Sequence, residues 1–212
     1  MKSIDYSLYL VTNNKDEKEF LNIIEESIKG GVSLVQIREK SSSTKDFYEL
    51  SLKVKAITSK YNVPLIINDR LDVALAINAE GVHVGQDDMP CSKVRQIIGP
   101  DKIIGVSAST IEEAQKAEKD GADYIGSGAL FNTSSKDDAP KITKNDLKNI
   151  TKSISIPVVA IGGITLDNIK EFKDTGIKGI SVVSAIMNSD NPKLSAIELK
   201  NEFNKIIKVD FY

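Results

Sequence analysis

The chain has 212 residues and a net charge of −2, with 28 Lys and Arg against 30 Asp and Glu. This balance provides no general attraction to nucleic acid, so phosphate recognition must be local. The single cysteine, Cys91, excludes an internal disulfide framework, and its place beside Pro90 at a helix start indicates a structural thiol. No apolar run approaches the ~20 residues that span a bilayer, and the first residues lack a signal-peptide pattern. We therefore expect a cytoplasmic protein.

Eight short segments rich in β-branched residues are apolar on successive positions rather than on alternate ones. Continuous apolar runs of this length are typical of strands that are buried on both faces, as in a parallel sheet. We predict strands at 7–11, 34–38, 64–68, 81–84, 103–107, 124–126, 158–161 and 179–183.

Helical patterns follow most of these strands. The first, 16–29, places Phe20, Ile23, Ile24 and Ile28 on one stripe. The other predicted helices are 44–60, 71–77, 92–98, 109–119, 145–151, 166–174 and 193–207.

A glycine stands before four of the predicted strands, where a helix would end. These glycines are Gly31, Gly81, Gly121 and Gly176. Glycine is favoured there because the residue after a helix often takes a left-handed backbone. About eight strand–helix units in this length favour a single (β/α)₈ TIM barrel over residues 1–212. The stretch 131–143 lacks periodicity, which indicates a functional loop after the sixth strand.

Polar residues end several of these strands, and parallel strands would gather them on one rim. The active site of a TIM barrel lies at the carboxyl ends of its strands. Arg38 and Lys40 follow the second strand and could clamp an anion, with Arg as a planar fork and Lys as a compact charge. Alternatively, the segment is a solvated loop in which Glu39 pairs with one of these cations.

Two carboxylates, Asp69 and Asp88, follow the third and fourth strands and could share one site. Mg²⁺ prefers oxygen ligands and often takes one or two carboxylates together with substrate phosphates. The alternative is that one of these carboxylates caps the following helix, since Asp69 precedes 71–77 and Asp88 precedes Pro90.

Gly162 and Gly163 follow the seventh strand, where barrels frequently bind phosphate. Their backbone could approach phosphate oxygens, and Val183 and Ser184 after the eighth strand could complete such a cradle. A tight turn without a ligand is the alternative.

Three further polar features have weaker patterns. The hydroxyls and lysine of 133–138 could close over an anion, although a solvated loop would have the same composition. Ser107 ends the fifth strand and could donate a hydrogen bond to a substrate or only cap a turn. His83, the single histidine, alternates with Val82 and Val84, so we expect it to pack between sheet and helices.

Taken together, these residues resemble the thiamine-phosphate synthase family, whose members join the pyrimidine and thiazole halves of thiamine. The resemblance runs in order through nearly the whole chain. Its segments are Gln36-Ile37-Arg38-Glu39-Lys40, Asn68-Asp69-Arg70, 81–88, Gly105-Val106-Ser107, 131–136, 160–164 and 180–185. The second and third segments are specific in combination, whereas a Gly-Gly pair is not.

The resemblance implies a barrel enzyme that uses Mg²⁺ and joins hydroxymethylpyrimidine diphosphate to thiazole phosphate, or to its carboxylated form. It implies that the pyrimidine diphosphate contacts Gln36, Ile37, Arg38, Glu39, Lys40, Asn68, Ser107 and Lys136. It implies that the thiazole phosphate contacts Thr133, Ser134, Ser135, Gly163, Val183 and Ser184. By the same resemblance, Asp69 and Asp88 would hold Mg²⁺, and Arg38, Lys40 and Lys136 would act in catalysis.

Two departures from the family pattern lie in and near the active site. Asn132 replaces a proline and Ser135 a threonine in the loop after the sixth strand. Serine keeps the hydroxyl, whereas loss of the proline should loosen the loop. The second departure is at Ala108 and Ser109, near which the family often has a threonine or a histidine.

The chemistry of the implied substrates suggests a dissociative reaction. An aminopyrimidine can stabilise a cation at its methylene carbon, so we expect diphosphate to leave before the thiazole nitrogen attacks. The alternatives are a thiazole tautomerase, which needs no diphosphate site, and a catalytically silent sensor of thiamine phosphate. The presence of Asp69, Asp88 and Lys136 favours the synthase. We expect small-molecule partners, with no nucleic acid or membrane, and the sequence leaves a homo-oligomer open.

Overall fold

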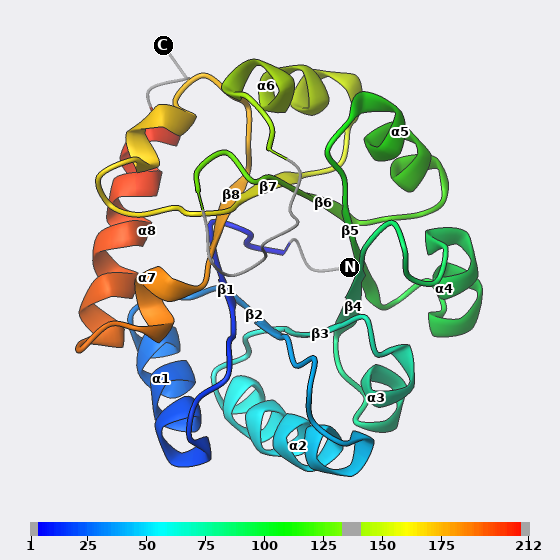
Figure 1. Ribbon diagram of the computed structural model, residues 1–212, viewed down its shortest axis with the longest axis vertical. Coiled ribbons are helices and arrows are strands. Elements are labelled where there is room, and N and C mark those ends of the chain that lie inside the picture. The colour runs from blue at the N-terminus through cyan, green and yellow to red at the C-terminus, as the bar shows by residue number, and fades with distance from the viewer. Residues whose placement is uncertain (1–3, 133–140, 209–212) are drawn as a thin grey trace.

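The computed structural model describes residues 4–132 and 141–208. Its centre is a closed barrel in which each strand pairs in parallel with the next and β8 pairs with β1 (Figure 1). The strands are β1 Leu8–Val11, β2 Leu34–Ile37, β3 Leu65–Asn68, β4 Gly81–Val84, β5 Ile103–Ser107, β6 Tyr124–Ser127, β7 Val158–Ile161 and β8 Gly179–Val182. The predicted TIM barrel is confirmed, and the predicted strands agree with these bounds to within one residue at each end.

Helices surround the barrel on its outside (Figure 1). They are α1 Glu17–Lys29, α2 Thr44–Lys60, α3 Leu71–Ala76, α4 Cys91–Ile98, α5 Ile111–Lys119, α6 Lys144–Ser153, α7 Ser184–Met187 and α8 Pro192–Lys208. Side chains cap several of the helix starts. Asp16 accepts the N–H of Lys18, and Thr110 and Thr143 form capping boxes with Glu113 and Asp146.

The segment after β7 differs from the prediction. Instead of a helix at 166–174, only a 3₁₀ turn forms, at Ile169–Phe172. The Asn168 side chain accepts the N–H of Thr165 and donates to the carbonyl of Gly163, which favours a turn over a regular helix. The short α7 is absent from the expected elements because four residues carry no usable periodicity.

The glycines before the strands behave as expected at three of four positions. Gly31, Gly121 and Gly176 have φ values of 108°, 95° and 82°. Gly81 instead lies within β4, where a Cβ would come within 2.6 Å of the Ile103 Cβ. At Gly81 the requirement is therefore close strand packing rather than a left-handed backbone.

Side-chain alternation divides the core into two parts. Along β1, Leu8 and Leu10 join the core between barrel and helices, whereas Tyr9 and Val11 point into the barrel. The inner cluster contains Tyr6, Tyr9, Val11, Leu34, Ile66, Ile103, Tyr124 and Val159. Most of these residues lie toward the amino-terminal ends of the strands, so the carboxyl-terminal half of the lumen is available to polar side chains.

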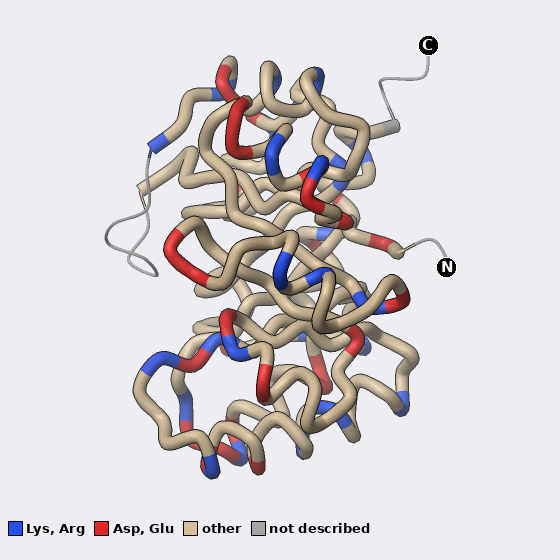
Figure 2. Tube along the Cα trace, turned by 90° about the vertical axis from the view of Figure 1, so that its right-hand side faces the viewer, with Lys and Arg blue, Asp and Glu red and all other residues tan. Residues whose placement is uncertain are grey.

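Charged residues of both signs are interspersed along the trace (Figure 2). This mixture agrees with the near-neutral net charge of −2. Within residues 4–132 and 141–208, none of the helices combines the length and apolar composition that a bilayer crossing requires.

Candidate active site

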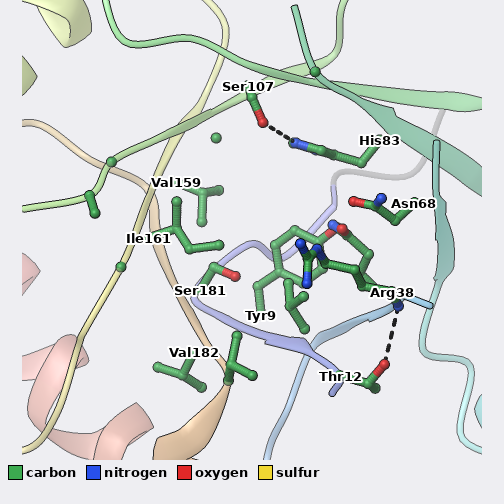
Figure 3. Close-up of a pocket in the computed structure, with 18 of the residues that line it drawn as sticks. Tyr9, Thr12, Arg38, Asn68, His83, Ser107, Val159, Ile161, Ser181 and Val182 are labelled. Carbon is green, nitrogen blue, oxygen red and sulfur yellow. Dashed lines mark hydrogen bonds between the residues drawn. The ribbon is translucent and has the colours of Figure 1, made fainter. Parts of the chain in front are cut away.

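A cavity of about 720 Å³ opens at the carboxyl ends of the strands. Every strand or the loop after it contributes a side chain or glycine to its wall. Figure 3 shows several of these residues, among them Asn68, His83 and Ser107. In strand order these include Thr12, Gln36, Asn68, His83, Ser107, Gly126, Ile161 and Ser181. The barrel thus brings eight segments that are distant in sequence to one pocket, as predicted from the polar strand ends.

The cationic side of the pocket follows β2. Arg38 and Lys40 both line the cavity, and the Arg38 backbone N–H donates to Thr12 Oγ1 at 3.2 Å. Glu39 accepts hydrogen bonds from Ser41 and Ser42. The alternative in which Glu39 pairs with Lys40 is therefore not observed. Lys40 Nζ contacts Asp69 at 3.5 Å instead.

Two predicted substrate-contacting residues of the same segment lie away from the cavity wall. The Ile37 side chain is 1% exposed and belongs to the core between barrel and helices. The Glu39 carboxylate faces its own loop rather than the cavity. Gln36, Asn68 and Ser107, by contrast, line the cavity as predicted.

Asp69 and Asp88 face one another across the ends of β3 and β4. Burial raises the pKa of Asp69, and hydrogen bonding with Asp88 and the charge of Asp88 raise it further, while Lys40 opposes the shift. Asp88 Oδ2 also accepts the N–H of Gly85 at 2.7 Å. The two carboxylates therefore share one negatively charged corner of the cavity.

The capping alternative for these two carboxylates is wrong. The residues at the starts of α3 and α4 are Arg70 and Pro90, and neither start has a side-chain cap. Asp69 instead has a φ of 60°, and its N–H donates to the carbonyl of His83 at 2.8 Å. A backbone conformation that is unusual for a non-glycine residue thus turns the Asp69 carboxylate toward the cavity.

The carboxylate corner has a donor set that suits Mg²⁺ with substrate. No group of three or more His, Cys, Asp or Glu side chains in the described part of the chain could hold a metal alone. Mg²⁺ commonly retains water and completes its shell with substrate phosphates, so two carboxylates are sufficient protein ligands. Two carboxylates as close as Asp69 and Asp88 repel each other, and a bound divalent cation would relieve this repulsion.

The opposite side of the cavity is formed by backbone after β7 and β8. Gly162, Gly163, Val183 and Ser184 line it. Gly163 has a φ of 64°, and a Cβ there would lie 2.9 Å from the Phe131 Cβ. Only glycine therefore fits this close approach.

Four predicted site residues cannot be placed in this geometry. Thr133, Ser134, Ser135 and Lys136 lie outside the described residues. Their proposed contacts with substrate stay predictions.

The inner wall of the cavity contains residues that sequence reasoning assigned elsewhere or missed. His83 does not pack between sheet and helices: it faces the lumen and lines the cavity (Figure 3). Alternation correctly placed it opposite Val82 and Val84, but alternation does not show which face is the inside of a barrel. Tyr9 and Tyr124 also line this wall. In the sequence, both stand within apolar runs and look like ordinary core aromatic residues.

Cys91 lies apart from the cavity. Its side chain is buried, and burial, together with the charge of Asp120, raises the pKa of the thiol to about 11. A thiol with such a pKa is almost entirely protonated at neutral pH, which agrees with the expected structural role.

Comparison with known families now adds to this geometry. A family model described as thiamine monophosphate synthase matches residues 8–186. The chain belongs to the thiamine monophosphate synthase family. The resemblance expected from the sequence motifs is thereby confirmed, and the chain is an enzyme of the transferase class that acts in thiamine biosynthesis.

Curated relatives in this family match over nearly their whole length. The thiamine-phosphate synthase of Methanobrevibacter smithii is 63% identical over 204 residues, covering 96% of this chain and 98% of the relative. That of Clostridium acetobutylicum is 57% identical over 195 residues, covering 91% and 92%.

Solved structures support the same fold. Thiamine phosphate pyrophosphorylase from Pyrococcus furiosus superposes with a TM-score of 0.87 at 37% identity, covering 96% of this chain and 98% of that one. A 3-hexulose-6-phosphate synthase superposes with a TM-score of 0.70 at 15% identity, covering 92% and 99%, and shares the barrel fold alone.

Proposed function

We propose that residues 1–212 act as one barrel domain that joins hydroxymethylpyrimidine diphosphate to thiazole phosphate, or to its carboxylated form. The products are thiamine phosphate and pyrophosphate. The observation that carries this proposal is the joining of a cationic segment, a carboxylate pair and a glycine turn in one cavity. Family membership supports the same reaction.

The carboxylate corner is the proposed Mg²⁺ site. Asp69 and Asp88 would hold the ion, which supplies charge neutralisation for the departing diphosphate. Arg38 and Lys40, with Lys136 from outside the described residues, would neutralise the remaining phosphate charge. Lys40 Nζ contacts Asp69 at 3.5 Å, so the lysine ammonium and the proposed metal ligand lie at the same corner of the cavity.

The other side of the cavity is the proposed thiazole phosphate site. Gly163 would bring backbone N–H close to phosphate oxygens, and Val183 and Ser184 would add donors. Thr133, Ser134 and Ser135 would complete it from the loop after β6. The separation of the two sites across one cavity leaves the reacting carbon and nitrogen between them.

We propose a dissociative substitution. The bond between the pyrimidine methylene carbon and the diphosphate oxygen breaks first, and its electron pair leaves with the diphosphate. The thiazole nitrogen then donates its lone pair to the methylene cation and forms the new C–N bond. No protein nucleophile is needed, so the residues act by positioning the reactants and by stabilising charge.

The alternative functions are less well supported by the geometry. A thiazole tautomerase would not use the carboxylate corner, and it needs an acid–base group near the thiazole. His83 reaches the cavity, but its two ring nitrogens are 2.9 Å from Tyr124 and Ser107, which engages both in hydrogen bonds. A sensor would need none of the charges aimed at a leaving group.

One experiment separates these functions. The purified protein is incubated with both substrates and Mg²⁺, and pyrophosphate and thiamine phosphate are measured together. We expect both products in equal amounts, and neither when one substrate or Mg²⁺ is omitted. Isomerisation of the thiazole phosphate alone would establish the tautomerase, and binding of thiamine phosphate without turnover would establish the sensor.

A further inference from the structure

A continuous chain of hydrogen bonds crosses the inner wall of the cavity. Gln36 Nε2 donates to the Tyr9 hydroxyl at 2.5 Å, and that hydroxyl lies 2.8 Å from the Tyr124 hydroxyl. The Tyr124 hydroxyl lies 2.9 Å from His83 Nδ1. His83 Nε2 lies 2.9 Å from Ser107 Oγ, the contact drawn as a dashed line in Figure 3. These hydrogen bonds link Gln36 on β2 to Ser107 on β5, and both residues line the cavity.

The barrel is built to hold these side chains. Gly105 and Gly126 face the same part of the lumen, and a Cβ at Gly126 would lie 3.0 Å from His83 Cε1. A Cβ at Gly105 would overlap both the Tyr124 ring and the His83 ring. At the far end, the Ser107 carbonyl is anchored by Gln86 Nε2 at 2.6 Å. The positions of the five members are therefore set by packing as well as by hydrogen bonds.

The two phenols keep their protons. Burial raises the pKa of Tyr9 and of Tyr124 well above the ordinary value for tyrosine. Each phenol therefore has one proton to donate and one oxygen to accept with. Once the donor at one end of this row of hydrogen bonds is known, the donor and acceptor of each following bond can be assigned.

The direction follows from the Gln36 end. Because the Tyr9 oxygen accepts from Gln36, the Tyr9 proton is directed to Tyr124. Tyr124 then donates its own proton to His83 Nδ1, which must be unprotonated to accept it. The His83 proton therefore lies on Nε2 and is donated to Ser107. Ser107 accepts from His83, so its own hydroxyl proton remains to be donated to a ligand.

With the Gln36 amide oriented so that Nε2 faces Tyr9, the opposite direction leaves a buried group without a partner. The same amide turned by 180° would let Tyr9 donate to Gln36 Oε1 and would aim Nε2 at the ligand, which is the reverse of the arrangement proposed below and is what the His83 tautomer tests. If His83 carried its proton on Nδ1, Tyr124 would have to donate to Tyr9. The Tyr9 oxygen would then face donors from both Gln36 and Tyr124, and its own proton would have no acceptor among the described residues. Tyr9 is 2% exposed, and an unmade hydrogen bond at such a buried site is unfavourable.

We propose that Tyr9, Tyr124 and His83 are positioning residues that hold Gln36 Oε1 as an acceptor and the Ser107 hydroxyl as a donor toward the ligand. This arrangement selects an aminopyrimidine ring over the corresponding oxopyrimidine. The selection rests on the proposed function, whereas the direction of the chain does not.

The chemical basis of the selection is complementarity. An aminopyrimidine offers an amino donor and ring nitrogens that accept. An oxopyrimidine offers a carbonyl acceptor in place of the amino group and carries an N–H on the ring. It would therefore present an acceptor to Gln36 Oε1. A site whose polar groups are left unpaired by the wrong ligand discriminates strongly against that ligand.

The direction can be tested without substrate. His83 is the only histidine, so ¹⁵N-histidine labelling of the whole protein gives one pair of ring-nitrogen resonances. At neutral pH we expect the neutral Nε2–H form, with Nδ1 unprotonated, in wild type. A predominant Nδ1–H form would overturn the proposal. This measurement does not depend on activity, so it stays decisive if the protein fails to make thiamine phosphate.

The selectivity is tested by Tyr124→Phe and Tyr9→Phe, which break the chain at two different points. We expect kcat/KM for the aminopyrimidine diphosphate to fall about ten-fold, mainly through KM, as one hydrogen bond is lost. We expect preference over the oxopyrimidine diphosphate to fall by a similar factor, and the His83 resonances of Tyr124→Phe to lose their single Nε2–H form.

Tyr6→Phe is the matched control. Its ring lies 5.0 Å from that of Tyr124 and is buried in the inner cluster, but no hydrogen bond of the chain passes through it. We expect its substrate preference to equal that of wild type. An unchanged preference in both Tyr124→Phe and Tyr9→Phe, or an equal loss in Tyr6→Phe, would show that the chain is only structural.

Discussion

Lys40 Nζ lies 3.5 Å from Asp69 Oδ2 and joins the cationic segment after β2 to the carboxylate corner after β3. Lys40 offsets the repulsion between Asp69 and Asp88 only in part, because the pKa of Asp69 remains raised by burial and by Asp88. The corner therefore keeps an excess of negative charge that a divalent cation would balance.

Asp69→Asn removes one proposed Mg²⁺ ligand and keeps the size of the side chain. We expect turnover to fall on the order of 10²–10³-fold, by analogy with the loss of one group aimed at developing charge. We also expect the remaining activity to depend less steeply on Mg²⁺. Steady-state pyrophosphate release against Mg²⁺ concentration measures both effects.

Asp72→Asn is the control for this change. Asp72 is an exposed carboxylate on α3 that pairs with Arg70 and does not line the cavity. We expect it to retain wild-type turnover. If Asp69→Asn keeps the wild-type rate and Mg²⁺ response, the assignment of Asp69 is refuted.

Mg²⁺ should stabilise the folded protein in a pH-dependent manner. Because the folded-state pKa of Asp69 is raised, its contribution to stability is present at low pH and is lost as pH rises through the raised value. Ionised Asp69 is thus unfavourable at neutral pH, and Mg²⁺ binding offsets this. At one hundred times its Kd, Mg²⁺ adds ~2.7 kcal/mol. For a chain of this size the corresponding rise in Tm is roughly 5–10 °C.

Thermal unfolding with and without Mg²⁺ between pH 5 and 8 checks this prediction. We expect the rise in Tm to shrink toward low pH, where protonation of Asp69 competes with the cation. Asp69→Asn should show little rise at any pH, and without Mg²⁺ at pH 7.5 its Tm should equal or exceed that of wild type. A lower Tm of Asp69→Asn under those conditions would contradict the repulsion argument.

Gly163→Ala tests the glycine turn after β7. The new Cβ would strain a backbone with φ 64° and press on Phe131 and Asn132. We expect the KM for thiazole phosphate to rise about ten-fold or more, with a smaller effect on the KM for the pyrimidine diphosphate. Steady-state kinetics with each substrate varied in turn separates the two.

Gly176→Ala is matched to Gly163→Ala because Gly176 also has a left-handed backbone, with φ 82°, but does not line the cavity. Both changes should lower stability by ~1 kcal/mol through backbone strain. Only Gly163→Ala should alter the KM for thiazole phosphate. Equal kinetic effects in the two variants would remove Gly163 from the proposed phosphate site.

Arg95 should stabilise the end of the barrel opposite the cavity. Its guanidinium donates to the carbonyls of Gly99, Lys102 and Gly121 and pairs with Asp123 at 2.6 Å. Arg95→Met leaves these partly buried acceptors without donors, so we expect a loss of ~2 kcal/mol in the free energy of unfolding. Urea denaturation measures this loss.

Lys93→Met is the control, because it introduces a methionine on the same helix, α4, two positions before Arg95. Among the described residues, the Lys93 ammonium bonds only to Gln96. We expect its stability to lie within about 0.5 kcal/mol of wild type. Neither variant should change kcat. A stability loss in Lys93→Met as large as in Arg95→Met would point to the helix rather than to the guanidinium network.

Much of the site could be predicted from where polar residues stand relative to the ends of apolar runs. Arg38, Asp69, Asp88, Gly163 and Ser184 all follow strands, and the carboxyl ends of parallel barrel strands lie on one side. Local order in the chain therefore implied a common location. The capping alternative for Asp69 and Asp88 needed the structure, because a carboxylate before a helix has the same pattern in both roles.

The inner wall could not be predicted in the same way. Strands of a parallel barrel are apolar on both faces, so His83, Tyr9 and Tyr124 carry no mark of which face they occupy. Only closure of the barrel decides which residues meet across the lumen.

The sequence by itself determined the strands, the barrel and the order of charged residues on its rim, because these depend on local apolar patterns and on strand direction. The tertiary structure alone decided that Asp69 meets Asp88 and Lys40, and that Gln36 is linked to Ser107 through Tyr9, Tyr124 and His83. These contacts join residues of different strands, and their distances follow from how the closed sheet is packed rather than from any neighbour in the chain.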